Sequence, residues 1–116
     1  MLDDKTTIIP ARGALQIRTG LAFEIPDGYV LNVYSRSGHG FKNGLRLANS
    51  VGVVDSDYKG EVQVKIHNDS NERFTVKHGD RIAQAMLERV EQVRLVEVEA
   101  LSESERGAGG FGSTGI

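Results

Sequence analysis

Short segments in which apolar and polar residues alternate one by one dominate the sequence, and glycine-containing turns separate them. The clearest is EVQVKIHN, residues 61–68, whose Val62, Val64 and Ile66 fall on one face of an extended strand. LQIRTGLAFEI, residues 15–25, has the same period of two. The chain holds 14 glycines but only two prolines, a balance that favours turns over long helices. These patterns predict an all-β domain of the barrel or jelly-roll type.

The remaining strands are predicted from shorter apolar runs. They are YVLNVYS, residues 29–35, LRLANSVGVV, residues 45–54, with an interruption near Asn49, RFTV, residues 73–76, and RIAQAML, residues 81–87. Residues 36–44 are predicted to be loop because three glycines break every periodicity. Residues 88–105 hold four valines, which favour a strand, although their charge pattern would also suit a helix. We predict a strand there.

Length and composition indicate one cytosolic domain. The chain has 116 residues, of which 39% are hydrophobic and 26% charged, as is usual for a globular protein. Its net charge of −2 without a basic stripe argues against nucleic-acid binding. No apolar run is long enough to span a membrane, and the N-terminus MLDDKTT lacks a signal peptide's hydrophobic region. The absence of cysteine excludes disulfides and thiolate chemistry.

DSDYKG, residues 55–60, carries two aspartates two positions apart and invites a metal interpretation. As a calcium loop it fails, because a lysine stands at a ligand position and Ile66 would be the twelfth residue. On its own the segment reads as a hairpin turn, in which aspartate and glycine are common for backbone reasons. Asp55 and Asp57 would nevertheless point to one face, so one of them can take part in chemistry.

RSG, residues 36–38, combines a guanidinium, a hydroxyl and a flexible backbone, which together can hold a phosphate. An isolated R-S-G is more often a solvent-exposed turn. Gln84 shares the parity of Ile82 and Met86, where an apolar residue is expected. A polar side chain on an otherwise buried face needs a partner in the protein or in a ligand.

Two other features are interpreted without a catalytic role. GAGGFG, residues 107–112, matches the dinucleotide-binding pattern, but only four residues follow it and no helix can begin there. His39, His67 and His78 have no spacing typical of a metal site, and we interpret all three as surface residues. There is also no Ser/His/Asp arrangement with a convincing nucleophile.

The last segment, RGAGGFGSTGI, holds five glycines, one arginine and one aromatic residue. Composition alone would make it a disordered tail. Its place in a longer succession changes that interpretation. SRSGHG, residues 35–40, is followed by NSVGVVDSDYKGEVQV, residues 49–64, by GDRIAQ, residues 79–84, and by RGAGGFGSTG, residues 106–115. This succession closely resembles four of the five motifs of the homotrimeric dUTPase family, in order and over nearly the whole chain.

The resemblance implies a strand-swapped homotrimer of β jelly-roll subunits of the β-clip type, with three active sites each built from three subunits. It implies a barrel domain over residues 1–105 and a mobile arm over residues 106–116 that closes on a neighbouring subunit. Members hydrolyse dUTP with Mg²⁺ to dUMP and pyrophosphate, which keeps uracil out of DNA and supplies dUMP for dTMP synthesis. Asp55 then corresponds to the residue that activates the attacking water and contacts the deoxyribose 3′-hydroxyl, whereas Asp57 keeps its turn role.

The resemblance also assigns substrate contacts. Tyr58 corresponds to the tyrosine that packs on the deoxyribose and excludes a 2′-hydroxyl. Asn49 would pair with the uracil edge, helped by main-chain groups around Gly52 and Gln63, in a slot too narrow for the methyl group of thymine. Phosphate contacts are implied for two groups of residues. They are Arg36, Ser37, Gly38 and Gln84 in the body, and Arg106, Gly112, Ser113 and Thr114 in the tail, where Phe111 would stack on the uracil.

The sequence departs from the family at its first motif, which carries an aspartate that helps to hold hydrated Mg²⁺. Asp3 and Asp4 do not stand in a matching context, so the metal-binding residue is unknown. We expect a truncated form of a longer enzyme rather than a natural short form. Smaller departures are Ser35, where the family usually has proline, and His39, where an aliphatic residue is common.

Two other functions compete with the dUTPase interpretation. A catalytically impaired, nucleotide-binding regulatory relative is favoured only by the missing first motif. A dCTP deaminase relative would have a different arginine-serine loop and no GGFGSTG arm.

Overall fold

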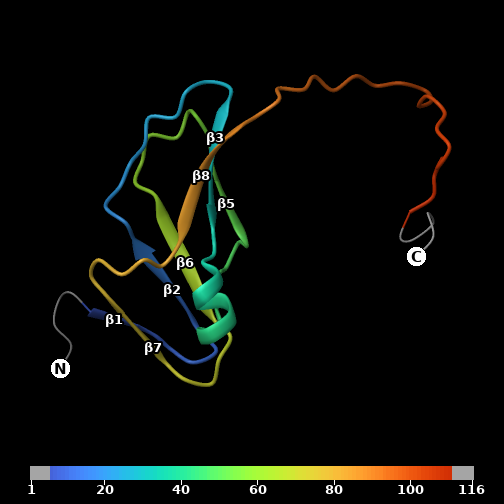
Figure 1. Ribbon diagram of the computed structural model, residues 1–116. Helices are drawn as coiled ribbons and strands as arrows, with labels where there is room; N and C mark the ends of the chain where they lie inside the picture. Colours follow the sequence, from blue (N-terminus) through green and yellow to red (C-terminus); the bar gives the residue numbers. More distant parts are fainter. Residues whose placement is uncertain (1–5, 111–116) are drawn as a thin grey trace.

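The computed structural model of the chain describes residues 6–110 and is built almost entirely of β-strands (Figure 1). This confirms the predicted all-β class. One short helical segment, η1, interrupts the strands. The elements are β1 (Thr6–Ile9), β2 (Ala14–Arg18), β3 (Tyr29–Tyr34), η1 (His39–Asn43), β4 (Leu45–Leu47), β5 (Val51–Val54), β6 (Gln63–Asn68), β7 (Phe74–Lys77) and β8 (Gln84–Arg89).

The strands form three small antiparallel sheets. β1 pairs with β7, β6 lies between β2 and β4, and β3 lies between β5 and β8. β3 therefore joins β5, which leads into the DSDYKG turn, to β8, which begins at Gln84. This topology places three of the sequence motifs around the edges of two adjoining sheets.

The core follows from the alternation noted in the sequence. Val62, Val64 and Ile66 are 8%, 6% and 3% exposed, as their shared parity predicts. They pack in one cluster with Ile9 and Leu47, which are almost fully buried. Burying each such aliphatic side chain stabilises the fold by about 1.5–3 kcal/mol, so this cluster holds the sheets together.

Two predicted boundaries are wrong. The strand predicted for residues 15–25 ends at Arg18, because Gly20 adopts a left-handed conformation with φ of 73°. The loop predicted for residues 36–44 contains η1, a five-residue π-helical turn. Gly44, with φ of 69°, ends this turn and donates its N–H to His39 O. Within residues 6–110, no helix has the length and apolar character needed to cross a membrane.

Asn68 is the fully buried polar residue of the described core. Its amide nitrogen donates to Ile9 O at 3.2 Å and Glu72 O at 2.8 Å, so it links β1 to the turn after β6. Its side-chain oxygen accepts from Ser70 N at 3.0 Å. A single side chain therefore satisfies one buried and two partly buried backbone groups.

Asn68→Ala is expected to lower the free energy of unfolding by about 2–4 kcal/mol, because it leaves buried carbonyl and amide groups unpaired. Urea unfolding followed by circular dichroism at one protein concentration measures the change. Asn71→Ala is the matched control: Asn71 is exposed, and its side-chain oxygen accepts from Arg12 Nε at 3.0 Å. Equal losses in the two variants would contradict the structural role given to Asn68.

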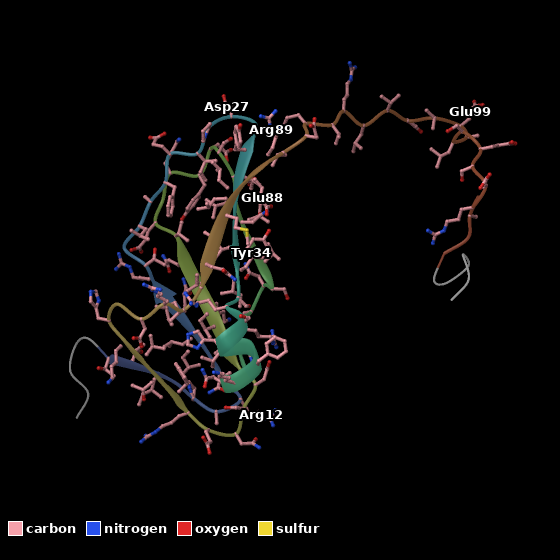
Figure 2. All side chains as sticks on the ribbon, in the orientation of Figure 1. Arg12, Asp27, Tyr34, Glu88, Arg89 and Glu99 are labelled. Atoms are coloured by element: carbon pink, nitrogen blue, oxygen red, sulfur yellow. The ribbon has the colours of Figure 1, made fainter. Side chains whose placement is uncertain are left out.

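The C-terminal segment, residues 90–110, leaves the strands and runs into open space (Figures 1 and 2). The strand predicted for residues 88–105 is therefore wrong beyond Arg89, since β8 ends there and residues 90–105 pair with no strand of the described chain. Its apolar side chains are exposed; Val93 is 79% and Leu95 93% exposed. The radius of gyration is 19.6 Å, against about 13 Å for a compact domain of this length.

Candidate active site

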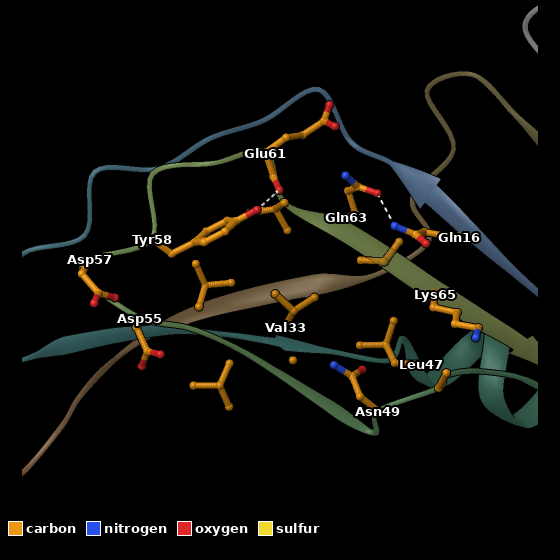
Figure 3. Close-up of a pocket in the computed structure, with 16 residues that line it drawn as sticks. Gln16, Val33, Leu47, Asn49, Asp55, Asp57, Tyr58, Glu61, Gln63 and Lys65 are labelled. Carbon is orange, nitrogen blue, oxygen red and sulfur yellow. Dashed lines mark hydrogen bonds between the residues drawn. The ribbon is translucent and has the colours of Figure 1, made fainter.

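A cleft of about 950 Å³ lies between the turn after β5 and the start of β6 (Figure 3). β3 and the segment around Leu47 form its floor. The cleft brings together five of the predicted site residues, all from the continuous stretch of residues 49–63. They are Asn49, Gly52, Asp55, Tyr58 and Gln63.

Asp55 directly follows β5 and lies with Asp57 at one end of the cleft (Figure 3). A turn closes behind it, since Tyr58 N donates to Asp55 O at 3.1 Å. Both aspartates are exposed. Within the described residues 6–110, no hydrogen bond or ion pair engages the Asp55 carboxylate, so it is available to a ligand or to water.

A hydrogen bond to Glu61 holds Tyr58 over the turn, and Gly60, which has no side chain, leaves room for the ring. Its hydroxyl donates to Glu61 O at 2.7 Å. A Cβ at Gly60 would lie 2.7 Å from the same hydroxyl oxygen and 2.9 Å from the ring. Only glycine therefore permits this ring position, and the ring presents a flat surface to the cleft with 46% of the residue exposed.

Glu61 anchors the turn to the neighbouring strand. Its carboxylate accepts from Arg18 Nε at 2.7 Å and from Gly20 N at 2.9 Å. The hydrogen bond from Arg18 is the main reason that the pKa of Glu61 lies below its ordinary value. Glu61 lines the cleft but was missed by the sequence analysis, because its place in the alternation indicates only an exposed strand position.

Asn49 lies toward the other end of the cleft, in the tight turn between β4 and β5, and Gly52 is the second residue of β5 (Figure 3). Ser50 adopts φ of 65° there, and Val51 N donates to Asn49 O at 2.7 Å. A Cβ at Gly52 would lie 3.4 Å from both Asn49 Nδ2 and Val33 Cβ, so the backbone of β5 passes close to the Asn49 amide. Gln63 accepts a hydrogen bond from Gln16 Nε2 at the rim.

Arg36, Ser37, Gly38 and Gln84 line a second cavity, of about 330 Å³. Arg81 and Lys42 also line it, so three cationic side chains surround the space. No carboxylate is among its lining residues in the described part of the chain. The arrangement is suited to a multiply charged anion such as a phosphate chain.

The explanation given for Gln84 from the sequence needs correction. The strand face that it shares with Met86 is exposed rather than buried, and Met86 itself is 49% exposed. β8 lies at the edge of its sheet, and this face receives no cover from the described part of the chain. Gln84 Nε2 donates to Ser35 O at 3.0 Å, which directs the amide toward the loop that precedes Gly38.

Of the three histidines interpreted as surface residues, His78 is exposed, whereas His39 and His67 are half-buried. His67 is half-buried on β6, and its Nδ1 lies 2.8 Å from Asp69 Oδ1. His39 is half-buried in η1 and bonds through both ring nitrogens. No pattern in the sequence indicated these contacts: His39 bonds to the backbone of the distant Arg81 and to Asn43 within η1, and His67 contacts Asp69 in the following turn.

The described part of the tail contributes nothing to either cavity. Arg106 is exposed and donates from Nε to Gly109 O at 2.5 Å, within a local turn. The predicted tail contacts of Phe111, Gly112, Ser113 and Thr114 lie outside the described residues. One chain therefore presents two cavities that share no lining residue.

The residues present do not fit a resident metal ion. Within residues 6–110, no three histidine, aspartate or glutamate side chains are placed together to hold one. Mg²⁺ is commonly bound through only one or two carboxylates, with water and substrate phosphates as its other ligands. A magnesium ion here would have to be held largely by such ligands.

Known proteins resemble this chain over nearly its whole length. The dUTPase family model matches residues 2–115. A protein of Nautilia profundicola named deoxyuridine 5′-triphosphate nucleotidohydrolase is 54% identical over 99 residues, which are 85% of this chain and 70% of that protein. A protein of the same name from Rhizobium johnstonii is 50% identical over 110 residues, 95% of this chain and 70% of that protein.

A solved structure has the same fold. It is a mutant dUTPase of Staphylococcus bacteriophage 80alpha with dUpNHpp, 28% identical to this chain, with a TM-score of 0.87. The similarity covers 97% of this chain and 82% of the phage protein. Sequence, fold and family model agree, and the chain is a hydrolase that belongs to the dUTPase family.

Proposed function

We propose that this protein hydrolyses dUTP between the α- and β-phosphorus, giving dUMP and pyrophosphate. The observation that carries the proposal is the single cleft in which Asn49, Asp55 and Tyr58 meet, in a chain of the dUTPase family. We assign the reaction to cytoplasmic nucleotide metabolism, where it keeps uracil out of DNA and supplies dUMP for dTMP synthesis.

Asp55 is the proposed base. Its exposed carboxylate can accept a proton from water and direct that water to the α-phosphorus. Most of the barrier is lowered by positioning the triphosphate and by neutralising its charge. The carboxylate then has only to orient a weak nucleophile, which an unpaired aspartate at the end of a rigid strand can do.

Selection of deoxyuridine is proposed for the opposite walls of the cleft. The Tyr58 ring, fixed by Glu61 O and Gly60, would lie flat on the deoxyribose and collide with a 2′-hydroxyl. Asn49 would bond the uracil edge, together with main-chain groups around Gly52 and Gln63. Exclusion by shape suits an enzyme that must reject the similar nucleotides UTP and dTTP.

Phosphate binding is proposed for the second cavity, through Arg36, Ser37, Gly38 and Gln84. Since the two cavities share no lining residue, we infer that a complete site combines the cleft of one subunit with the phosphate cavity of another. The exposed apolar side chains of residues 90–101 support association between copies, because a monomer would leave them in water. We propose that the assembly is the trimer that the resemblance implies. The tail would then bring Arg106 and Phe111 to a neighbour's site.

Mg²⁺ is proposed to enter as a complex with the triphosphate. Bound there, it would neutralise phosphate charge. The described residues have no ligand set for the ion, so we assign none of them to it.

We expect the full chain, assayed with Mg²⁺, to release pyrophosphate from dUTP at least about a hundredfold faster than from dTTP, UTP or dCTP, since even one methylene group in a pocket is worth about 10- to 200-fold. A coupled pyrophosphate assay measures the four rates side by side. Comparable rates with all four nucleotides would contradict the proposed specificity. Tight dUTP binding without turnover would replace the proposal with a nucleotide-binding regulatory role.

A further inference from the structure

His39 lies between the two segments that form the walls of the phosphate cavity. Arg36, Ser37 and Gly38 precede it directly, and Arg81 and Gln84 come from the segment that leads into β8. His39 is half-buried among them.

Both nitrogens of the His39 ring are engaged. Nε2 lies 2.9 Å from Arg81 O, and because a carbonyl oxygen only accepts, Nε2 carries the proton. Asn43 Nδ2 lies 3.2 Å from Nδ1, which accepts from it as a neutral ring nitrogen can. The ring also meets Phe74 edge to face, with centroids 5.5 Å apart. No ring N–H remains free to bind an anion, so His39 cannot act as a phosphate ligand in this arrangement.

The bond to Arg81 O crosses from one wall of the cavity to the other. Gln84 Nε2 makes a second crossing, to Ser35 O at 3.0 Å. Arg36, Lys42 and Arg81 line the same space, and their positive charges repel one another when no anion is bound. A link between the walls is therefore needed to keep the cavity at one width before a ligand arrives.

We propose that His39 is a positioning residue that sets the width of the phosphate cavity by tying η1 to the backbone of Arg81. The inference rests on the proposed function, which gives this cavity its phosphate ligand. A cavity held at the correct width binds the phosphates without first having to close, and so binds them more tightly.

The test compares two amides that differ by one methylene group. His39→Gln places an amide nitrogen near the position of Nε2, where it can still donate to Arg81 O. His39→Asn carries the same group but is too short to reach that carbonyl. We expect His39→Asn to raise the KM for dUTP about tenfold, the effect of losing one hydrogen bond, and His39→Gln to stay within about threefold of the parent chain.

Two further measurements separate positioning from general damage. The inhibition constant of deoxyuridine, which has no phosphate, should be unchanged in His39→Asn. His78→Asn is the matched control, since His78 is exposed and lies outside this cavity. Equal KM values for His39→Gln and His39→Asn, or equal weakening of dUTP and deoxyuridine, would overturn the inference.

Binding of inorganic pyrophosphate, measured by calorimetry, tests the inference without turnover. The parent chain should bind pyrophosphate about tenfold more tightly than His39→Asn, again the effect of one hydrogen bond. If the parent chain binds pyrophosphate in this way but leaves dUTP intact, the proposed hydrolysis fails and the role of His39 stands. If the parent chain hydrolyses dUTP but binds pyrophosphate no more tightly than His39→Asn does, only the role of His39 fails.

Discussion

Asp55→Asn is expected to lower kcat for dUTP hydrolysis by roughly 10²- to 10⁴-fold, the usual contribution of a general base. The amide keeps the size of the side chain and its place after β5, so the cleft should keep its shape. It cannot take a proton from water. Affinity for dUpNHpp, the dUTP analogue with nitrogen between the α- and β-phosphorus, should therefore change by less than about threefold, since this binding does not need the base.

Asp57→Asn is the matched control for this experiment. Asp57 lines the same cleft two residues further on, and the substitution removes the same charge. We assign Asp57 a turn role, so its variant should keep kcat within about threefold of the parent chain. Normal turnover in Asp55→Asn would remove Asp55 from the mechanism. Equal losses in the two variants would mean that the combined negative charge matters, rather than one base.

Deletion of the tail, residues 106–116, is expected to reduce kcat/KM by roughly 10²- to 10³-fold, comparable to the loss of a residue that stabilises charge in the transition state. Arg106 would no longer neutralise the γ-phosphate, and the site would stay open to water. The body should remain folded, because the core contacts all lie within residues 9–83. Steady-state kinetics, together with circular dichroism and light scattering, measures both expectations.

The control for the deletion removes only the last two residues, 115–116, which carry no proposed contact. That shorter deletion should leave kcat/KM within about twofold of the parent chain. Full activity after the longer deletion would show that the tail does not act as a lid. Loss of the oligomer in the longer deletion would show instead that the tail contributes to assembly.

The strands of the body could be predicted because their side chains alternate against one core. Val62, Val64 and Ile66 are buried as their spacing requires. The strand predicted beyond Arg89 was wrong because extended backbone needs a pairing partner, and a pattern of valines cannot say whether one is present. The strand predicted for residues 15–25 was too long. Apolar and polar residues keep alternating after Arg18, but the left-handed conformation of Gly20 breaks the extended backbone.

The candidate site could be predicted only in part. The motif that resembles the family's pointed to Asp55 and Tyr58, and the cleft contains both. It gave no sign of why Gly60 must be glycine, which depends on where the Tyr58 ring lies. The hydrogen bond from His39 to Arg81 O could not be predicted either, because any residue supplies a backbone carbonyl and the two residues are far apart in the sequence.

The exposed side chains of residues 90–101 bear on how the protein is made in the cell. In the proposed trimer these side chains would be covered by other copies, so a newly released chain would expose Val93, Leu95 and their neighbours to water until it assembled. During that interval other apolar surfaces, including those of unrelated nascent chains, can bind these exposed side chains in place of a second copy. Translation of several copies from one messenger RNA would raise the local concentration of the chain and shorten the time before copies associate. Yield of the folded protein should thus depend on how fast the copies meet, and not only on how stable each one is.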